Sequence, residues 1–228
     1  MPAAILFDAV GTLIYPDPPV AAVYASASRR YGVQIGGAAI DTRFRAAFAR
    51  QEAIDRQLHG PKTSPQRERN RWREIVGDVF ADAVLAPRQR DELFESLWNH
   101  FAQPENWRLY DDVQPCWQAL ESRGLTIAVA SNFDDRLEAI AQQIPPLDRA
   151  KQLFISARLG HRKPAAEFFQ FIERELKIPP NELLSVGDNA ENDYEGALAA
   201  GWQSILLDRD RRRGSRAPGT IASLAEMR

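Results

Sequence analysis

Side chains suited to nucleophilic and metal chemistry stand shortly after four apolar runs of this 228-residue sequence. In chain order they are Asp8, Ser131 and Asn132, Lys163, Asp188 and Asp193. A carboxylate such as Asp8 can divide a hydrolysis into covalent capture and release. Carboxylates that lie together repel one another unless a cation offsets their charge, and their hard oxygens suit Mg²⁺ better than Zn²⁺. The pattern therefore predicts a carboxylate nucleophile beside a Mg²⁺ site.

The apolar runs themselves predict the strands that position these side chains. Each run is too short for a helix and almost continuously apolar, which is typical of strands buried on both faces. The predicted strands are Ala3–Phe7, Leu125–Ala130, Leu153–Ala157, Leu183–Gly187 and Ser204–Leu207. Helical patterns lie between them, so we expect an α/β fold with a Rossmann-like parallel sheet and helices on both faces. Ligands bind where the carboxyl ends of such strands meet, and there Ser131, Asn132 and Lys163 would hold an anionic group.

The interval between the first two predicted strands is far longer than one crossover helix requires. It opens with the proline-rich segment 15–19 and closes between Pro104 and Pro115, and the apolar spacing inside it is purely helical. We therefore expect an all-helical cap over residues 16–109. The Rossmann-like core would consist of residues 1–15 and 110–228.

Four segments of the sequence resemble the motifs of the haloacid dehalogenase-like (HAD) hydrolase superfamily, in the subfamily with a helical cap after the first strand. The segments are Phe7–Leu13, Ala130–Asn132, Lys163–Pro164 and Val186–Asp193. The resemblance implies a hydrolase in which Asp8 is the nucleophile and Lys163 a second catalytic group, with Mg²⁺ as the cofactor. The implied metal site consists of Asp8, the Val10 carbonyl, Asp188 and Asp193. The implied substrate-binding residues are Thr12, Ser131, Asn132 and Lys163, although Thr12 fits an ordering role in its loop better.

Val10 departs from the pattern of the superfamily's phosphatases, which usually place an acid–base Asp two residues after the nucleophile. A valine side chain transfers no proton, and loss of a positioned acid–base group costs about 10²–10⁴ in rate. The leading interpretation is a Mg²⁺-dependent phosphatase acting on a small phosphorylated metabolite. The alternatives are a 2-haloacid dehalogenase, whose halide leaves without a proton, and a catalytically idle HAD-fold binding protein. For a dehalogenase, Arg45 is the candidate that would bind the substrate carboxylate.

The charge balance, the apolar stretches and the cysteine count exclude several classes of protein. Lys and Arg number 29 against 31 Asp and Glu, a net charge of −2, and this balance argues against nucleic-acid binding. No apolar stretch approaches the roughly 18 residues of a membrane span, and the N-terminus lacks the basic region of a signal peptide. The single cysteine, Cys116, excludes an internal disulfide. We therefore expect a soluble, cytoplasmic protein that binds a small anionic molecule and neither nucleic acid nor a membrane.

Arginines and tryptophans are interpreted as parts of the fold rather than of the site. Arg67, Arg69, Arg71 and Arg73 point to different sides of a helix, so we expect a solvated face there. We expect the five tryptophans to lie in the core. The arginine-rich segment Arg209–Arg216 is expected to form a solvated loop near the C-terminus.

Overall fold

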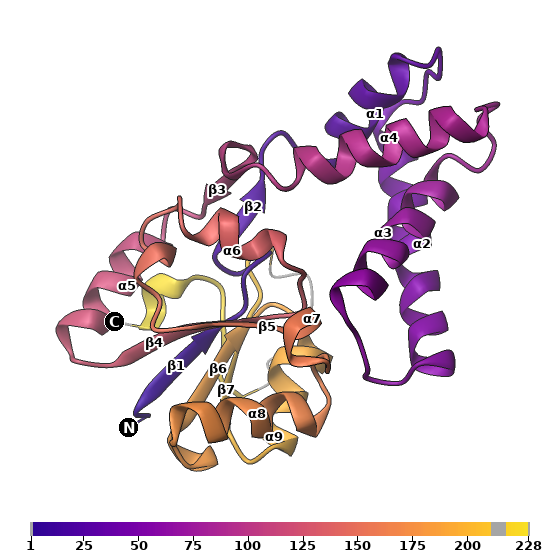
Figure 1. The fold of residues 1–228 in the computed structure, drawn as a ribbon. Helices are drawn as coiled ribbons and strands as arrows, with labels where there is room; N and C mark the ends of the chain where they lie inside the picture. Colours follow the sequence, from indigo (N-terminus) through magenta and orange to yellow (C-terminus); the bar gives the residue numbers. More distant parts are fainter. Residues whose placement is uncertain (1, 211–217, 228) are drawn as a thin grey trace.

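A six-stranded parallel sheet forms the centre of the molecule, with the strand order β5-β4-β1-β6-β7-β8 (Figure 1). The computed structural model describes residues 2–210 and 218–227. The strands of this sheet are β1 Ala4–Phe7, β4 Thr126–Ser131, β5 Leu153–Ile155, β6 Leu183–Gly187, β7 Gln203–Leu207 and β8 Thr220–Ile221. The strand predicted over 153–157 ends at Ile155, because Ser156 begins a short helix, α7 (Ser156–Leu159). The predicted α/β class is confirmed.

Helices cover both faces of the sheet because the central strands are apolar on both faces. Ile5 and Phe7 of β1 pack on the side of α5 (Val113–Ser122) and α6 (Arg136–Ala141). Their neighbours in β1, Ala4 and Leu6, pack on the opposite side against α8 (Ala166–Leu176) and α9 (Gly196–Ala199). Cys116 is a buried residue of the first layer. Shorter turns are Pro104–Asn106, Leu147–Arg149, Pro180–Glu182, Leu224–Met227 and the π-helical turn Ala190–Glu195.

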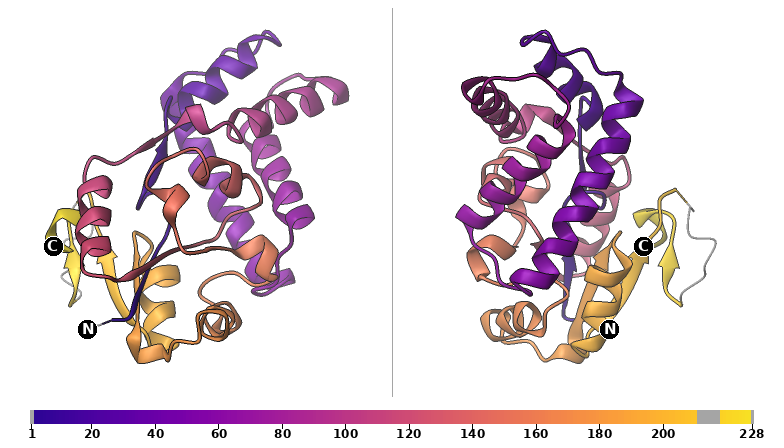
Figure 2. Two further views of the ribbon diagram at one scale, coloured as in Figure 1. Left: turned by 60° about the vertical axis from the view of Figure 1, so that its left-hand side comes forward. Right: turned by 90° about the vertical axis from the view of Figure 1, so that its right-hand side faces the viewer.

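Four helices inserted after β1 lie beyond the carboxyl ends of the parallel strands (Figures 1 and 2). They are α1 Val20–Arg29, α2 Gly37–Leu58, α3 Pro65–Val79 and α4 Pro87–His100. These helices bury an apolar core of their own, separate from the two layers on the sheet. A two-stranded antiparallel ribbon, β2 (Ile14–Pro16) with β3 (Trp107–Leu109), lies where the insertion leaves and rejoins the core. We call the α1–α4 insertion the cap.

Backbone contacts hold the loop between α2 and α3 against the core. Thr63 N–H donates to the Gly160 carbonyl at 3.0 Å, and Arg162 N–H donates to the Pro61 carbonyl at 2.9 Å. Lys62 and His161 form an isolated antiparallel bridge between these bonds. The cap is therefore joined to the segment that leads into Lys163.

A cluster of six charged side chains, here called the ion cluster, reinforces this junction. It consists of Glu52, Asp55, Glu68, Arg67, Arg71 and Arg162. Arg162 comes from the core and donates to Glu52 at 2.7 Å and to Asp55 at 3.0 Å. The Arg71 side chain is only 4% exposed. The prediction of a solvated arginine face is therefore wrong at Arg71, because its acidic partners lie on other turns of the cap.

Arg209 also differs from the prediction. Its guanidinium donates to Asp112 at 2.8 Å and to the carbonyl of Thr12 at 2.7 Å, and it lies 3.8 Å from the centre of the Tyr110 ring. The solvated loop predicted for Arg209–Arg216 is thus wrong at Arg209, because the loop after β1 supplies carbonyl acceptors. Residues 211–216 of that prediction lie outside the described part of the chain. Within the described residues, none of the helices combines the length and the apolar character that crossing a bilayer requires.

Candidate active site

Three carboxylates converge at the carboxyl edge of the sheet. Asp8 follows β1, Asp188 follows β6, and Asp193 lies on the π-helical turn after β6. One carboxylate oxygen from each lies within 4.8 Å of the others. Gly11 permits this approach: its φ is +90°, and a Cβ at this position would lie 2.6 Å from Oδ2 of Asp188. The structure thus brings together the three acids that the sequence predicted as metal ligands.

Lys163 links two of these acids. Its buried ammonium donates to Oδ1 of Asp8 at 2.8 Å, to Oδ1 of Asp193 at 2.5 Å and to the Ala130 carbonyl at 2.7 Å. Burial alone would lower the pKa of Lys163, but Asp193 and Asp8 raise it above its ordinary value. A lysine ammonium has three donors, and all three are used here. Lys163 therefore remains charged and fixes the orientation of Asp8.

The remaining negative charge is poorly compensated. Loss of solvation, followed by repulsion from Asp8 and Asp193, raises the pKa of Asp188 to about 7. Burial also raises the pKa of Asp193, although Lys163 opposes that effect. Three carboxylates share one ammonium, and their oxygens are the ligand type that Mg²⁺ prefers. The donor set therefore fits a divalent cation of this kind.

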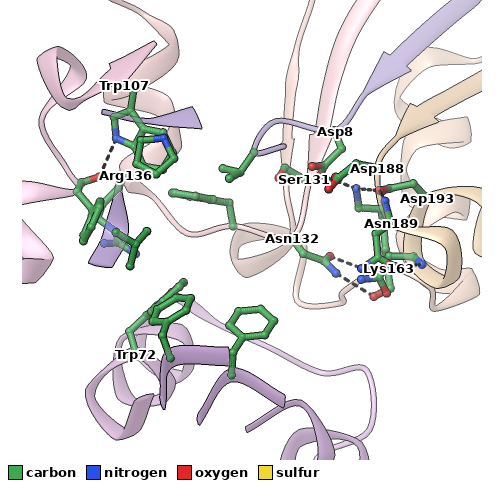
Figure 3. A pocket seen from close by; sticks show the side chains of 18 of the residues that line it. Asp8, Trp72, Trp107, Ser131, Asn132, Arg136, Lys163, Asp188, Asn189 and Asp193 are labelled. Carbon is green, nitrogen blue, oxygen red and sulfur yellow. Dashed lines mark hydrogen bonds and ion pairs between the residues drawn. The ribbon is translucent and has the colours of Figure 1, made fainter. Parts of the chain in front are cut away.

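Two asparagines hold the loops around this cluster (Figure 3). Asn132 Oδ1 accepts from the backbone N–H of Lys163 at 2.8 Å, and its Nδ2 donates to the Lys163 carbonyl at 2.9 Å. Asn189 caps the π-helical turn by accepting from the N–H groups of Glu191 and Asn192. That turn places Asp193, whose Oδ2 accepts from Asn189 N–H. Asn132 was expected to bind substrate, and the structure shows its amide orienting Lys163 while it lines the adjacent cavity.

Thr12 lies behind the carboxylates rather than beside a ligand space. It is fully buried, and its hydroxyl lies 3.5 Å from Oδ1 of Asp188. Its carbonyl accepts from Arg209, as described above. Thr12 is absent from the lining of the cavity that Asp8 faces. Its geometry within the described chain is that of a residue that orders the loop after β1.

A cavity of about 380 Å³ lies between the carboxylates and the cap. Its floor includes Asp8, Ser131 and Asp188 at three strand ends, Val10 in the loop after β1, and Lys163 in the loop after α7. Its opposite walls are mainly aromatic and come from both the cap and the core (Figure 3). The aromatic lining residues are Tyr24, Phe44, Phe48, Trp72, Phe101, Trp107 and Phe133. Trp72, which was expected to lie in the core, packs half-buried against the core of the cap and also borders the cavity.

Arg136 is a cavity residue that the sequence patterns did not reveal. Its Nε and Nη2 donate to Asp134 at 2.8 and 2.7 Å, and its guanidinium lies 3.6 Å from the centre of the Trp98 ring. Arg45 is instead 71% exposed at its side chain and pairs with Asp41. Arg45 was therefore the wrong candidate for a cavity cation. The spacing of Arg45 in its helix does not indicate which side of that helix faces the cavity. Arg136 contacts Trp98 of α4, which is distant in the sequence, so no local pattern marks it as a cavity residue.

A profile of the haloacid dehalogenase-like hydrolases matches residues 2–201, which is most of the chain. The chain belongs to the haloacid dehalogenase-like hydrolase family. The resemblance inferred from the four segments is thereby confirmed, together with the helical insertion after the first strand.

Two sequence relatives cover most of this chain. Human haloacid dehalogenase-like hydrolase domain-containing protein 3 is 29% identical over 206 residues, covering 89% of this chain and 80% of the relative. Ribulose-1,5-bisphosphate 5-phosphatase of Halopiger xanaduensis is 26% identical over 212 residues, covering 91% and 85%. The family context is thus that of a hydrolase.

Solved HAD-like structures share the fold across almost the whole chain. HAD-hydrolase YfnB of Bacillus subtilis, whose crystal structure is bound to magnesium, superposes with a TM-score of 0.78 at 15% identity, covering 99% of this chain and 96% of that one. L-2-haloacid dehalogenase of Xanthobacter autotrophicus superposes with a TM-score of 0.74 at 19% identity, covering 100% and 97%. The same architecture therefore carries both metal-bound and dehalogenase members.

Proposed function

We propose that the protein is a Mg²⁺-dependent phosphatase that acts on a small phosphorylated metabolite, with Asp8 as the nucleophile. The convergence of Asp8, Asp188 and Asp193 within 4.8 Å is the observation that carries this proposal. The three acids and the Val10 carbonyl would hold Mg²⁺. The bound ion supplies positive charge that offsets the acids and the phosphoryl group of the substrate.

The side chains around Asp8 support a two-step transfer. One Asp8 oxygen is held by Lys163, which leaves the other free to attack phosphorus and form an aspartyl phosphate. Ser131 lines the cavity beside Asp8, where its hydroxyl can donate to a phosphoryl oxygen. Water then attacks phosphorus, releases inorganic phosphate and restores the Asp8 carboxylate. Asn132 contributes by keeping Lys163 in position.

Hydrolysis of acetyl phosphate tests this proposal without demanding a proton donor, because acetate is a good leaving group. We expect turnover that requires Mg²⁺ and disappears in Asp8→Asn, a nearly isosteric change. The melting temperature of the variant checks that the fold is intact. Undiminished hydrolysis by folded Asp8→Asn would contradict the assignment of the nucleophile.

A 2-haloacid dehalogenase is the second candidate, and Val10 is the observation that favours it. A departing halide needs no proton, so the apolar side chain at this position is no obstacle. The charges in the cavity oppose it: among the described lining residues, the cations Arg136 and Lys163 are both paired with carboxylates. A substrate carboxylate would thus meet no uncompensated positive charge there. Metal-independent release of chloride from 2-chloropropionate would reverse the preference.

A further inference from the structure

The cavity walls opposite the carboxylates are built from interlocking aromatic rings. Phe44 and Trp72 stack with their centres 6.3 Å apart, and Phe48 lies 6.2 Å from Trp72. On the core side, Phe133 meets the edge of Trp107 at 6.1 Å. All five rings line the cavity. Walls made of ring faces and edges favour packing against a further aromatic ring in the cavity.

The charged side chains at these walls, Arg136 and Asp134, are already paired with each other. The guanidinium of Arg136 is held by two hydrogen bonds to Asp134, and its carbon lies over the Trp98 ring, 3.6 Å from the ring centre. The Arg136 side chain is 9% exposed and that of Asp134 is 4% exposed. These walls therefore offer apolar and planar surface rather than a free ion for a sugar phosphate or a second carboxylate.

The size of the cavity suits one ring and one phosphoryl group. An apolar cavity of roughly 150 Å³ accommodates benzene, and the cavity here measures about 380 Å³. It is near the lower end of the range for small-molecule sites, about 300–1,000 Å³. A phosphoryl group placed against the carboxylate floor takes up part of this space, so a ring attached directly to phosphate fits better than a long or branched group.

Val10 points to the same class of substrate for a different reason. Its apolar side chain lines the cavity near Asp8, so it gives no proton to an oxygen that leaves phosphorus. A phenol ionises at a pH of about 10, as tyrosine does, whereas water ionises only at about 15.7. A phenolate therefore departs without protonation far more readily than an alkoxide does.

We propose that the substrate is an aryl phosphate monoester, in which a single aromatic ring is bonded to phosphate through oxygen. This inference rests on the phosphatase function proposed above. Asp8 forms a bond to phosphorus as the bond from phosphorus to the aryl oxygen breaks, and the electron pair leaves on the phenolate. Water then bonds to phosphorus as the bond from phosphorus to the Asp8 oxygen breaks, which restores the carboxylate and releases inorganic phosphate. The proton set free from the water is taken up by the phenolate, which leaves as phenol.

Four substrates, assayed with Mg²⁺, separate the phosphatase chemistry itself from the effects of the leaving group and of the aromatic ring. Acetyl phosphate carries no ring and tests the phosphatase function alone. Phenyl phosphate and benzyl phosphate share a ring but differ in leaving group, whereas benzyl and cyclohexylmethyl phosphate share an alkoxide leaving group and differ in aromaticity. We expect kcat/KM to be at least about tenfold higher for phenyl than for benzyl phosphate. We also expect KM to be lower for benzyl than for cyclohexylmethyl phosphate.

The matched variants are Phe44→Leu, at the cavity wall, and Phe171→Leu, in α8. Both phenylalanines are half-buried, and Phe171 packs against the core layer away from the cavity. Phe44→Leu should raise KM for phenyl phosphate by about three- to tenfold, the usual range for loss of an aromatic contact. The increase for acetyl phosphate should be smaller, and Phe171→Leu should behave as the wild type does.

Two results would overturn the inference in different ways. If acetyl phosphate is hydrolysed but phenyl phosphate has no advantage over benzyl or cyclohexylmethyl phosphate, the aryl assignment is wrong and the phosphatase function stands. The same conclusion follows if Phe44→Leu and Phe171→Leu have equal effects. If Mg²⁺-loaded enzyme hydrolyses neither acetyl nor phenyl phosphate, the phosphatase function itself fails.

Discussion

Replacement of Arg71 by leucine tests whether the ion cluster stabilises the cap. Arg71 contacts Glu52, Asp55 and Glu68, and the side chains of Asp55 and Glu68 are only 8% and 5% exposed. The cluster contains three carboxylates and three arginines, so Arg71→Leu leaves one buried negative charge without compensation. Breaking a buried ion pair in this way costs about 3–5 kcal/mol. Because Glu52 is 25% exposed and water can screen it, we expect the lower figure, about 3 kcal/mol.

Thermal unfolding measures this effect. A loss of about 3 kcal/mol lowers the melting temperature of a chain of this size by about 6–12 °C. Adding Glu68→Gln to Arg71→Leu should recover part of the loss, because glutamine removes the excess charge and still accepts from the Thr63 hydroxyl at 2.6 Å. Glu68→Gln alone should destabilise, since it unbalances the cluster in the other direction. A loss below about 1 kcal/mol for Arg71→Leu, with no recovery in the double variant, would refute this account of the cluster.

Two further predictions concern the carboxylate site. The pKa of Asp188 is raised to about 7, so the metal-free fold should lose stability as pH rises through that value. Mg²⁺ requires the ionised acid, so its apparent affinity should fall by up to about tenfold per pH unit below 7. The rise in melting temperature with millimolar Mg²⁺ should therefore be larger near pH 8 than near pH 6. Asp188→Asn should remove this difference between the two pH values. Val10→Asp should supply a proton donor and raise turnover of benzyl phosphate by about tenfold or more, with a smaller gain for phenyl phosphate; equal gains for both, measured on folded variant, would contradict the role assigned to Val10.

The sheet and the carboxylate site could be predicted because their signals are local in the sequence. A run such as Leu183–Gly187 is apolar except for Ser185 because β6 is covered on both faces, and Asp188 follows directly at its carboxyl end. Parallel strands end at a common edge, so Asp8, Lys163 and Asp188 could be assigned to one site before any distance was known.

The cap surfaces could not be predicted because their partners are distant in the sequence. Arg71 is buried because Arg162 and the acids of α2 lie against it, and no spacing within α3 indicates that meeting. Arg136 belongs to the cavity because α4 brings Trp98 over it. Helical periodicity shows that α3 has an apolar face, but it does not show that Trp72 at the edge of that face borders a ligand cavity.

The nucleophilic role of Asp8 can be tested most directly with beryllium trifluoride, which imitates a phosphoryl group bonded to a carboxylate. Crystals of the protein grown with Mg²⁺ and beryllium trifluoride should show beryllium bonded to the Asp8 oxygen that Lys163 does not hold. The fluorines, which stand in for phosphoryl oxygens, should lie beside Ser131 and Lys163. Beryllium bonded to another side chain, or its absence from Asp8 in crystals that contain Mg²⁺, would contradict the account.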